Sequence, residues 1–216
     1  MKEKPPIPPP IPPAEIERRS FEIIEKELPH ALDPLQAPII KRVIHTTADF
    51  SYADTLCFSD RAVEQGRAAL KNGAHIITDT QMTKAGINKN RLSTYGGEVH
   101  CFMSDEDVAA EALYRGVTRA AVSMEKSAII GENLNKSFIY AIGNAPTALI
   151  RLYELIVEGR LAPALVIGVP VGFVHVTEAK ELIMQTEVPY IVALGRKGGS
   201  NVAAAVCNAL LYGIDI

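Results

Sequence analysis

The chain has 216 residues, of which 48% are hydrophobic and 22% are charged, the composition of a globular protein with a sizeable core. Its net charge of -3 excludes the broad excess of Lys and Arg that non-specific nucleic-acid binding requires. No stretch approaches the roughly 18 apolar residues of a membrane span, and the N-terminus lacks the apolar core of a secretion signal. We therefore expect a cytoplasmic protein that binds neither nucleic acid nor membrane.

Residues 1–13 contain seven of the fourteen prolines, so they favour polyproline II and cannot form a helix or an inner strand. They are predicted to be a leader arm, with residues 14–216 forming a single domain. A ligand segment for an SH3-type module is an alternative use of the arm. The next helix is predicted from Ile16, Ile23, Ile24 and Leu28, and it ends before Pro29. Ser20 lies within this helix, where it is an ordinary surface residue unless a polar ligand docks there.

A second helix is predicted over residues 35–44, because the pairs Ile39/Ile40 and Val43/Ile44 are four positions apart. This helix places His45 at its carboxyl end. Imidazole has the side-chain pKa nearest neutrality and suits proton transfer. A histidine at a helix end also complements the helix dipole, and spacing alone favours that structural interpretation.

Short apolar strands then alternate with helices through the rest of the chain. The strands are predicted at 55–58, 74–78, 98–103, 137–142, 164–168 and 190–194. The helices are predicted at 60–70, 104–114, 118–130, 146–158, 177–185 and 201–211, with a capping box at 104–107. Strands that are apolar on both faces and separated by helices indicate a doubly wound α/β fold with a mainly parallel sheet and helices on both faces.

Ligands of such sheets bind at the carboxyl ends of the strands, and residues 195–200 occupy that position. Gly198 and Gly199 permit close approach of the backbone, Ser200 can cap the following helix, and Arg196 and Lys197 supply positive charge. A phosphate or carboxylate would fit there, although a plain capped turn explains the glycines almost as well. The segment is neither a Walker loop nor GxGxxG, so a nucleotide is not specifically indicated.

A second amide-rich turn at 143–147 carries Asn144, which can reach a ligand, and a structural helix start explains this turn equally well. Of the remaining histidines, His175 follows a turn and could face a ligand, whereas burial is the usual explanation for His75 and His100. The three cysteines are far apart and form no CxxC pair, so reduced thiols are expected. No His, Asp or Glu set has the sequence spacing of a metal site.

Six segments together resemble the precorrin-8X methylmutase family, over about residues 16–212. They are RSFEII (19–24), IIKRVIHTTADF (39–50), TDTQM (78–82), IGNAPTAL (142–149), PALVIGVPVGFV (163–174) and GRKGGSNVAAA (195–205). The resemblance implies a flavodoxin-like fold, a homodimer with shared active sites, and an isomerase that moves a methyl group from C-11 to C-12 of a corrin precursor in cobalamin biosynthesis.

Through HTTADF, GINK (86–89) and GRKGGSNVAAA, the chain further resembles the anaerobic-pathway branch of the family, whose substrate already carries cobalt. The substrate implied is therefore cobalt-precorrin-8, with metal-free precorrin-8X as the other form. The chain departs from the family pattern at 175–177, where HVT replaces small residues, and at Ala179, where Ser is common. These departures concern the contacts of one loop.

The resemblance also assigns roles to residues. His45 corresponds to the family's proton donor and acceptor, and Ser20 and Arg42 correspond to positions that line the site. We add residues that lie on anion-binding loops or carry charge as candidates for holding the substrate's carboxylates: Arg119, Asn144, Lys197, Gly199 and Ser200. No cofactor and no protein-bound metal are expected, since any cobalt belongs to the substrate. A non-catalytic corrinoid carrier and a nucleotide- or flavin-binding oxidoreductase are the alternatives.

Overall fold

The computed structural model describes residues 10–134 and 136–215. Most of the predicted leader, residues 1–9, lies outside this part of the chain. Helix α1 (Pro13–Glu27) begins at the last residue of the predicted leader, because proline is well suited to the first turn of a helix.

The core of the fold is a six-stranded sheet in the order β1-β6-β5-β4-β2-β3. The strands are β1 (Leu56–Phe58), β2 (His75–Thr78), β3 (Val99–His100), β4 (Phe138–Ile142), β5 (Leu165–Gly168) and β6 (Tyr190–Ala193). All neighbours are parallel except β1, which pairs antiparallel with β6 at the edge. Every residue of β2, β4 and β5 is buried, as expected for a sheet covered on both faces.

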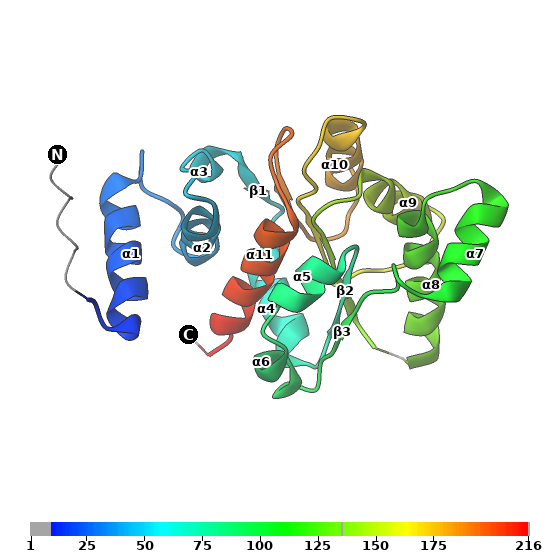
Figure 1. Ribbon diagram of the computed structural model, residues 1–216, viewed down its shortest axis with the longest axis horizontal. Helices are drawn as coiled ribbons and strands as arrows, with labels where there is room; N and C mark the ends of the chain where they lie inside the picture. Colours follow the sequence, from blue (N-terminus) through cyan, green and yellow to red (C-terminus); the bar gives the residue numbers. More distant parts are fainter. Residues whose placement is uncertain (1–9, 135, 216) are drawn as a thin grey trace, which may run out of the picture.

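Helices cover both faces of the sheet, so the predicted doubly wound α/β architecture is confirmed (Figure 1). One core contains residues from α2 (Ala37–Thr47), α3 (Tyr52–Thr55), α4 (Ala62–Lys71), α6 (Lys89–Ser93) and α11 (Ser200–Tyr212), with α5 (Gln81–Gly86) against α11. The other core contains residues from α7 (Glu106–Arg115), α8 (Arg119–Leu134), α9 (Pro146–Val157) and α10 (Val176–Met184). The five parallel strands follow the flavodoxin-like order, to which β1 adds an edge.

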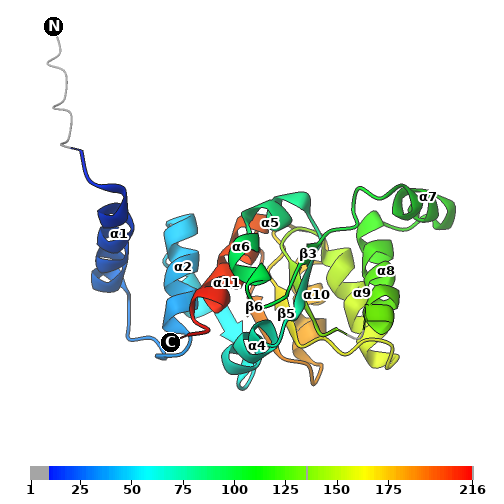
Figure 2. The same ribbon diagram turned by 90° about the horizontal axis from the view of Figure 1, so that it is seen from below.

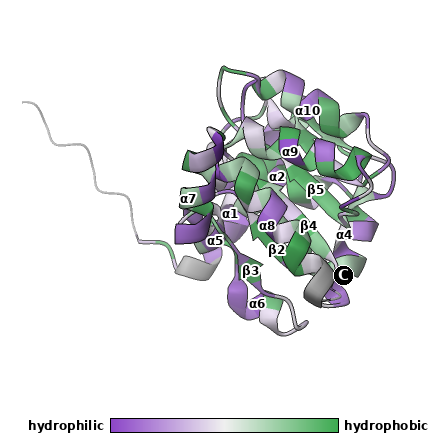
Figure 3. Ribbon diagram, turned by 90° about the vertical axis from the view of Figure 1, so that its right-hand side faces the viewer, coloured by the Kyte–Doolittle hydropathy of each residue, from purple (hydrophilic) through white to green (hydrophobic). Residues whose placement is uncertain are grey.

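Helix α1 lies outside α2 at one end of the molecule, and α7 lies outside α8 at the other (Figures 1 and 2). Viewed from the α7 side, apolar residues concentrate on the strands and on the helix faces turned toward them (Figure 3). None of the helices in the described part of the chain combines the length and the apolarity that a membrane crossing needs.

Several local predictions differ from the structure. The strand predicted at 98–103 is only two residues long, and helices α3, α5 and α6 were not predicted because four to six residues are too few to show a helical period. In α1 only Ile24 of the predicted apolar face is buried, while Ile16 and Ile23 stay exposed; α1 packs mainly against α2.

The predicted capping box at residues 104–107 is absent. Asp105 is the N-cap residue of α7, but its side chain makes no capping hydrogen bond. Its carboxylate instead accepts a hydrogen bond from Lys126 Nζ at 2.7 Å, and this charge-assisted contact replaces the cap.

Candidate active site

His45 lies in the last turn of α2, as the sequence predicts, and its side chain is exposed. The C-cap residue of the helix is Ala48, which adopts the left-handed conformation at φ 54°. The imidazole stacks on Phe21 of α1, with ring centroids 5.2 Å apart and an interplanar angle of 21°. No hydrogen bond to another described residue involves the imidazole nitrogens, so both are available to a ligand.

Arg42 lies one turn before His45 and contacts two other helices, α1 and α11. Its guanidinium is 4.8 Å from the centre of the Phe21 ring and 5.5 Å from that of Tyr212, and it forms an ion pair with Glu17. The side chain is therefore held between α1 and the end of α11. Ser20, also on α1, donates its hydroxyl to the carbonyl of Ile16 at 2.8 Å, the behaviour of an ordinary helix-surface serine.

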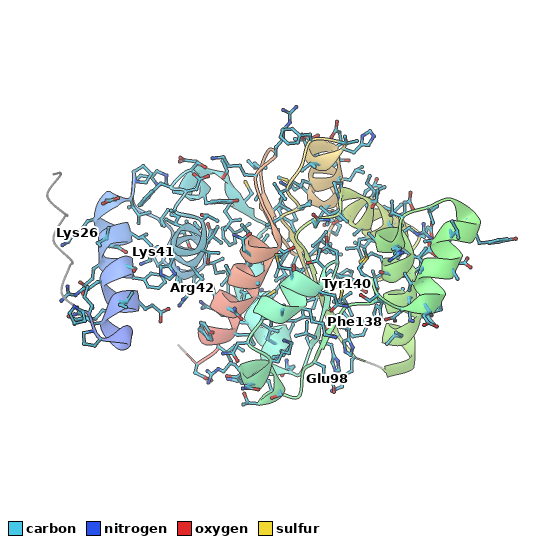
Figure 4. All side chains as sticks on the ribbon, in the orientation of Figure 1. Lys26, Lys41, Arg42, Glu98, Phe138 and Tyr140 are labelled. Atoms are coloured by element: carbon cyan, nitrogen blue, oxygen red, sulfur yellow. The ribbon has the colours of Figure 1, made fainter. Side chains whose placement is uncertain are left out.

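A surface pocket of about 480 Å³ opens between α1, α2 and α11 beside Arg42. Lys41 and Arg67 add two more cations to its wall, and Phe21 and Tyr212 add aromatic faces. Figure 4 shows the side chains of Lys41 and Arg42 between these helices. Arg67 Nε is buried without a hydrogen-bond partner among the described residues. Cations beside aromatic rings suit a ligand that carries carboxylates on a planar conjugated system.

Lys197 connects the loop after β6 to the end of α2. Its Nζ lies 2.6 Å from Asp49 Oδ2 and 2.9 Å from Ser51 Oγ. The ammonium of Lys197, together with the hydroxyl of Ser51, lowers the pKa of the Asp49 carboxyl. The contact places the loop at 195–200 near His45, but it also means that Asp49 already compensates the charge of Lys197.

Gly199 and Ser200 form the start of α11, where both contact the protein itself. The N–H of Gly199 donates to the carbonyl of Val169 at 2.9 Å. The hydroxyl of Ser200 pairs with Thr80 Oγ1 at 2.8 Å, and no side chain caps α11, so the predicted Ser200 cap is wrong. At Gly198 an added Cβ would lie 2.1 Å from the carbonyl oxygen of Val169, so this glycine is required by packing within the chain.

The amide-rich turn at 143–147 is already occupied by a carboxylate. Asp79 is fully buried, and its two carboxylate oxygens accept hydrogen bonds from the N–H groups of Gly143 at 2.9 Å, Asn144 at 2.8 Å and Ala145 at 2.6 Å. Burial raises the pKa of this carboxyl, and the three N–H groups act in the opposite direction. The turn therefore binds an anion, but that anion is a side chain of the protein. The Asn144 side chain itself is exposed.

The position of Asp79 also bears on the oxidoreductase alternative. In a flavodoxin-like sheet the ligand crevice lies where the strand order reverses, here between β2 and β4. The backbone amides that a cofactor phosphate would use at this point bind Asp79 instead. The geometry therefore disfavours a nucleotide or flavin at the switch point.

Lys180 is a residue of this region that sequence reasoning missed. It lies on α10 with 1% of its surface exposed, and its Nζ donates to the carbonyls of Gly195 at 2.7 Å and Lys197 at 2.9 Å. Burial lowers the pKa of this ammonium to about 8. Lys180 thereby fixes the shape of the loop that carries Lys197. Its neighbour Ala179 is also buried, which explains a small residue there.

The structure brings most of the predicted site residues together, but not all of them. Two neighbouring helices, α1 and α2, carry Ser20, Arg42 and His45. The ion pair of Lys197 with Asp49 links the end of α2 to the carboxyl ends of the strands, where Gly199, Ser200 and Asn144 lie. Arg119 begins α8 on the opposite face of the sheet, so it does not meet His45 within one chain (Figure 1). His175 precedes α10 with a left-handed φ of 55° and is exposed.

Taken together, the fold and the site define a doubly wound α/β protein whose exposed histidine stands beside a cationic, aromatic pocket. The model of the family described as precorrin-8X methylmutase matches residues 15–213. Cobalt-precorrin-8 methylmutase of Salmonella typhimurium is 48% identical, with 93% of this chain and 95% of that protein covered. Precorrin-8X methylmutase of Pseudomonas aeruginosa is 41% identical, covering 90% of this chain and 93% of the relative.

A solved structure of precorrin-8X methylmutase from Thermus thermophilus superposes with a TM-score of 0.84 at 41% identity, covering 93% of this chain and 97% of that one. The chain belongs to the precorrin-8X methylmutase family. It is accordingly an isomerase of cobalamin biosynthesis, as the resemblance implied.

Proposed function

We propose that the chain acts in the cytoplasm to convert cobalt-precorrin-8 to cobyrinate by moving a methyl group from C-11 to C-12, with His45 as proton donor and acceptor. The observation that carries the proposal is the placement of His45, exposed at the end of α2 and stacked on Phe21 beside the cationic pocket. Two relatives at 45% and 48% identity bear the cobalt-precorrin-8 name, which supports the cobalt form of the substrate.

The reaction needs little chemistry from the protein. In a suprafacial 1,5-shift the bond from the methyl group to C-11 breaks as the bond to C-12 forms, and only one tautomer of the ring is set up for this. His45 would give a proton to the macrocycle and take one back, which selects that tautomer with no net change in protons. Arg42, Lys41 and Arg67 would hold ring carboxylates, and orientation in the pocket would supply most of the remaining rate enhancement.

The proposal is tested by mixing the purified protein with cobalt-precorrin-8 under anaerobic conditions and following the absorbance spectrum. We expect conversion to a corrin spectrum, with a higher kcat/KM for the cobalt form than for precorrin-8X. Tight binding of either form without any spectral change would instead indicate the carrier. A higher kcat/KM for precorrin-8X would contradict the choice of substrate.

We also propose that two copies associate through the carboxyl edge of the sheet. The loop after β5 exposes Val171, Phe173 and Val174, with exposed fractions of 45%, 82% and 73%, and Leu194 follows β6 at the same edge. An apolar cluster of this kind is typical of an interaction surface. A second copy there would also bring another chain toward the loop of Lys197, as a shared active site requires.

Replacing Phe173 by Asp is expected to convert the dimer to a monomer, because a charge cannot be buried in an apolar contact without a large cost. Light scattering after size exclusion measures the mass, with 23.4 kDa for a single chain. The matched control is Val157→Asp, another exposed apolar residue, on α9, which should leave the mass of the dimer unchanged. A wild-type monomer, or dimer loss in the control alone, would contradict this interface.

A further inference from the structure

Two histidines and a glutamate meet at the edge of the sheet, away from the candidate active site. His75 begins β2, and His100 ends β3 beside it. His75 Nδ1 lies 2.8 Å from His100 Nε2, and Glu98 Oε2 lies 3.9 Å from the same nitrogen. One donor atom from each of the three residues falls within 4.8 Å of the others. Figure 4 labels Glu98 below Phe138 and Tyr140.

We propose that His75, Glu98 and His100 form a binding site for a divalent transition-metal ion, with Zn²⁺ as the best match. Two imidazoles and one carboxylate are a donor set that zinc uses with a fourth position left for water. The site is separate from the candidate active site, because the two rings pack against Phe102 and Phe138, which belong to the core on the face of the sheet opposite to α2 and α11.

The distances suit such an ion after small movements. Donors that hold zinc at about 2.0–2.1 Å in a tetrahedron stand about 3.3 Å from one another. The two imidazole nitrogens would separate slightly from 2.8 Å, and the glutamate oxygen would approach from 3.9 Å. The glutamate can make this movement, because its side chain is 71% exposed and forms no hydrogen bond with the described residues.

The surroundings hold the two imidazoles in place. The rings stack at 5.1 Å with an interplanar angle of 10°, between Phe138 and Phe102. Burial lowers the pKa of His75 and of His100. The ammonium groups of Lys136 and Lys84 lower the pKa of His75 and of His100, respectively, in the same direction. Glu98 supplies the negative charge that offsets the two ammonium groups.

The structural alternative is a hydrogen bond shared by two neutral histidines, which the 2.8 Å contact satisfies without an ion. The two interpretations differ in the role of Glu98. A simple histidine pair has no need of a carboxylate 3.9 Å away, whereas a metal ion would bind it directly.

The test is isothermal titration of the chelator-treated protein with Zn²⁺, followed by Co²⁺ titration read from visible d–d bands. We expect one equivalent of metal per chain, and tetrahedral Co²⁺ absorption. Glu98→Gln should weaken Zn²⁺ binding at least about tenfold, a size typical of changed metal-site contacts, and His100→Gln should abolish it. Because Glu98 is exposed, its variant reports on the site without a change in packing.

The control is His30→Gln, which removes the other described histidine–carboxylate pair, His30 Nε2 to Asp54 Oδ1 at 2.8 Å. This variant should bind Zn²⁺ as the wild type does. Equal Zn²⁺ affinity in wild type, Glu98→Gln and His100→Gln, or no binding by any of them, would overturn the proposal and leave a hydrogen-bonded pair.

Discussion

Replacing His45 by glutamine is expected to lower kcat for the methyl shift by about 10²- to 10⁴-fold, the usual contribution of a positioned proton donor and acceptor. Glutamine keeps a polar side chain of similar length at the end of α2. The ring stack on Phe21 is lost, but the pocket around Arg42 should change little, because none of its lining residues is replaced. The KM should therefore stay close to that of the wild type. The measurement is the rate of the spectral change at saturating cobalt-precorrin-8.

His175→Gln is the matched control, since it removes another exposed histidine, which precedes α10 on the other face of the sheet. It should retain the wild-type kcat. A His45→Gln enzyme that turns over at the wild-type rate would show that the proton comes from elsewhere. A large rise in KM at constant kcat would make His45 a binding residue.

Replacing Asp79 by asparagine is expected to destabilise the fold by about 3–5 kcal/mol, the range seen when one partner of a buried charged contact is removed. An asparagine amide can accept through one oxygen only, and its NH₂ group would face backbone N–H donors of the turn at 143–145. At least one donor would lose its acceptor: the N–H of Gly143 if the amide oxygen takes the place of Oδ2, or those of Asn144 and Ala145 if it takes the place of Oδ1. A few kcal/mol is a large part of the stability of a typical domain.

Urea unfolding followed by circular dichroism measures this effect as a lower midpoint at unchanged slope. Asp107→Asn is the control, because this exposed carboxylate pairs with Lys126, and Asp105 also holds that lysine. The control should unfold at the wild-type midpoint. An unchanged midpoint for Asp79→Asn would mean that water or a shifted side chain satisfies the amides of the turn.

Much of the fold follows from local sequence. The strands β2, β4 and β5 are visible along the chain as short continuous apolar runs, because they are buried on both faces, and α2 is visible through its period of 3.6 residues. The same regularity locates His45 at the end of its helix. The antiparallel direction of β1 is not visible, because three residues carry no signal of the partner with which they pair.

The anion-binding turns illustrate a limit of sequence reasoning. Glycine and free amides at residues 143–147 and 195–200 predict that something negative or closely packed lies there, and this is correct in physical terms. The sequence does not say what fills them. The carboxylate of Asp79 fills one turn from 64 residues away, and the backbone of Val169 packs against the glycines of the other.

The sequence by itself determined the doubly wound architecture, the position of His45 and, through six short segments, the family. Only the tertiary structure decided two contacts between residues that are distant in sequence. Lys180 supports the loop of Lys197 by donating to carbonyls 15 and 17 positions later, and His75 meets His100, 25 positions later. The physical reason is that periodicity reports which face of an element is buried, whereas side-chain partners depend on how distant elements pack. A residue such as Lys180 looks like a solvated helix position until α10 is placed against the sheet.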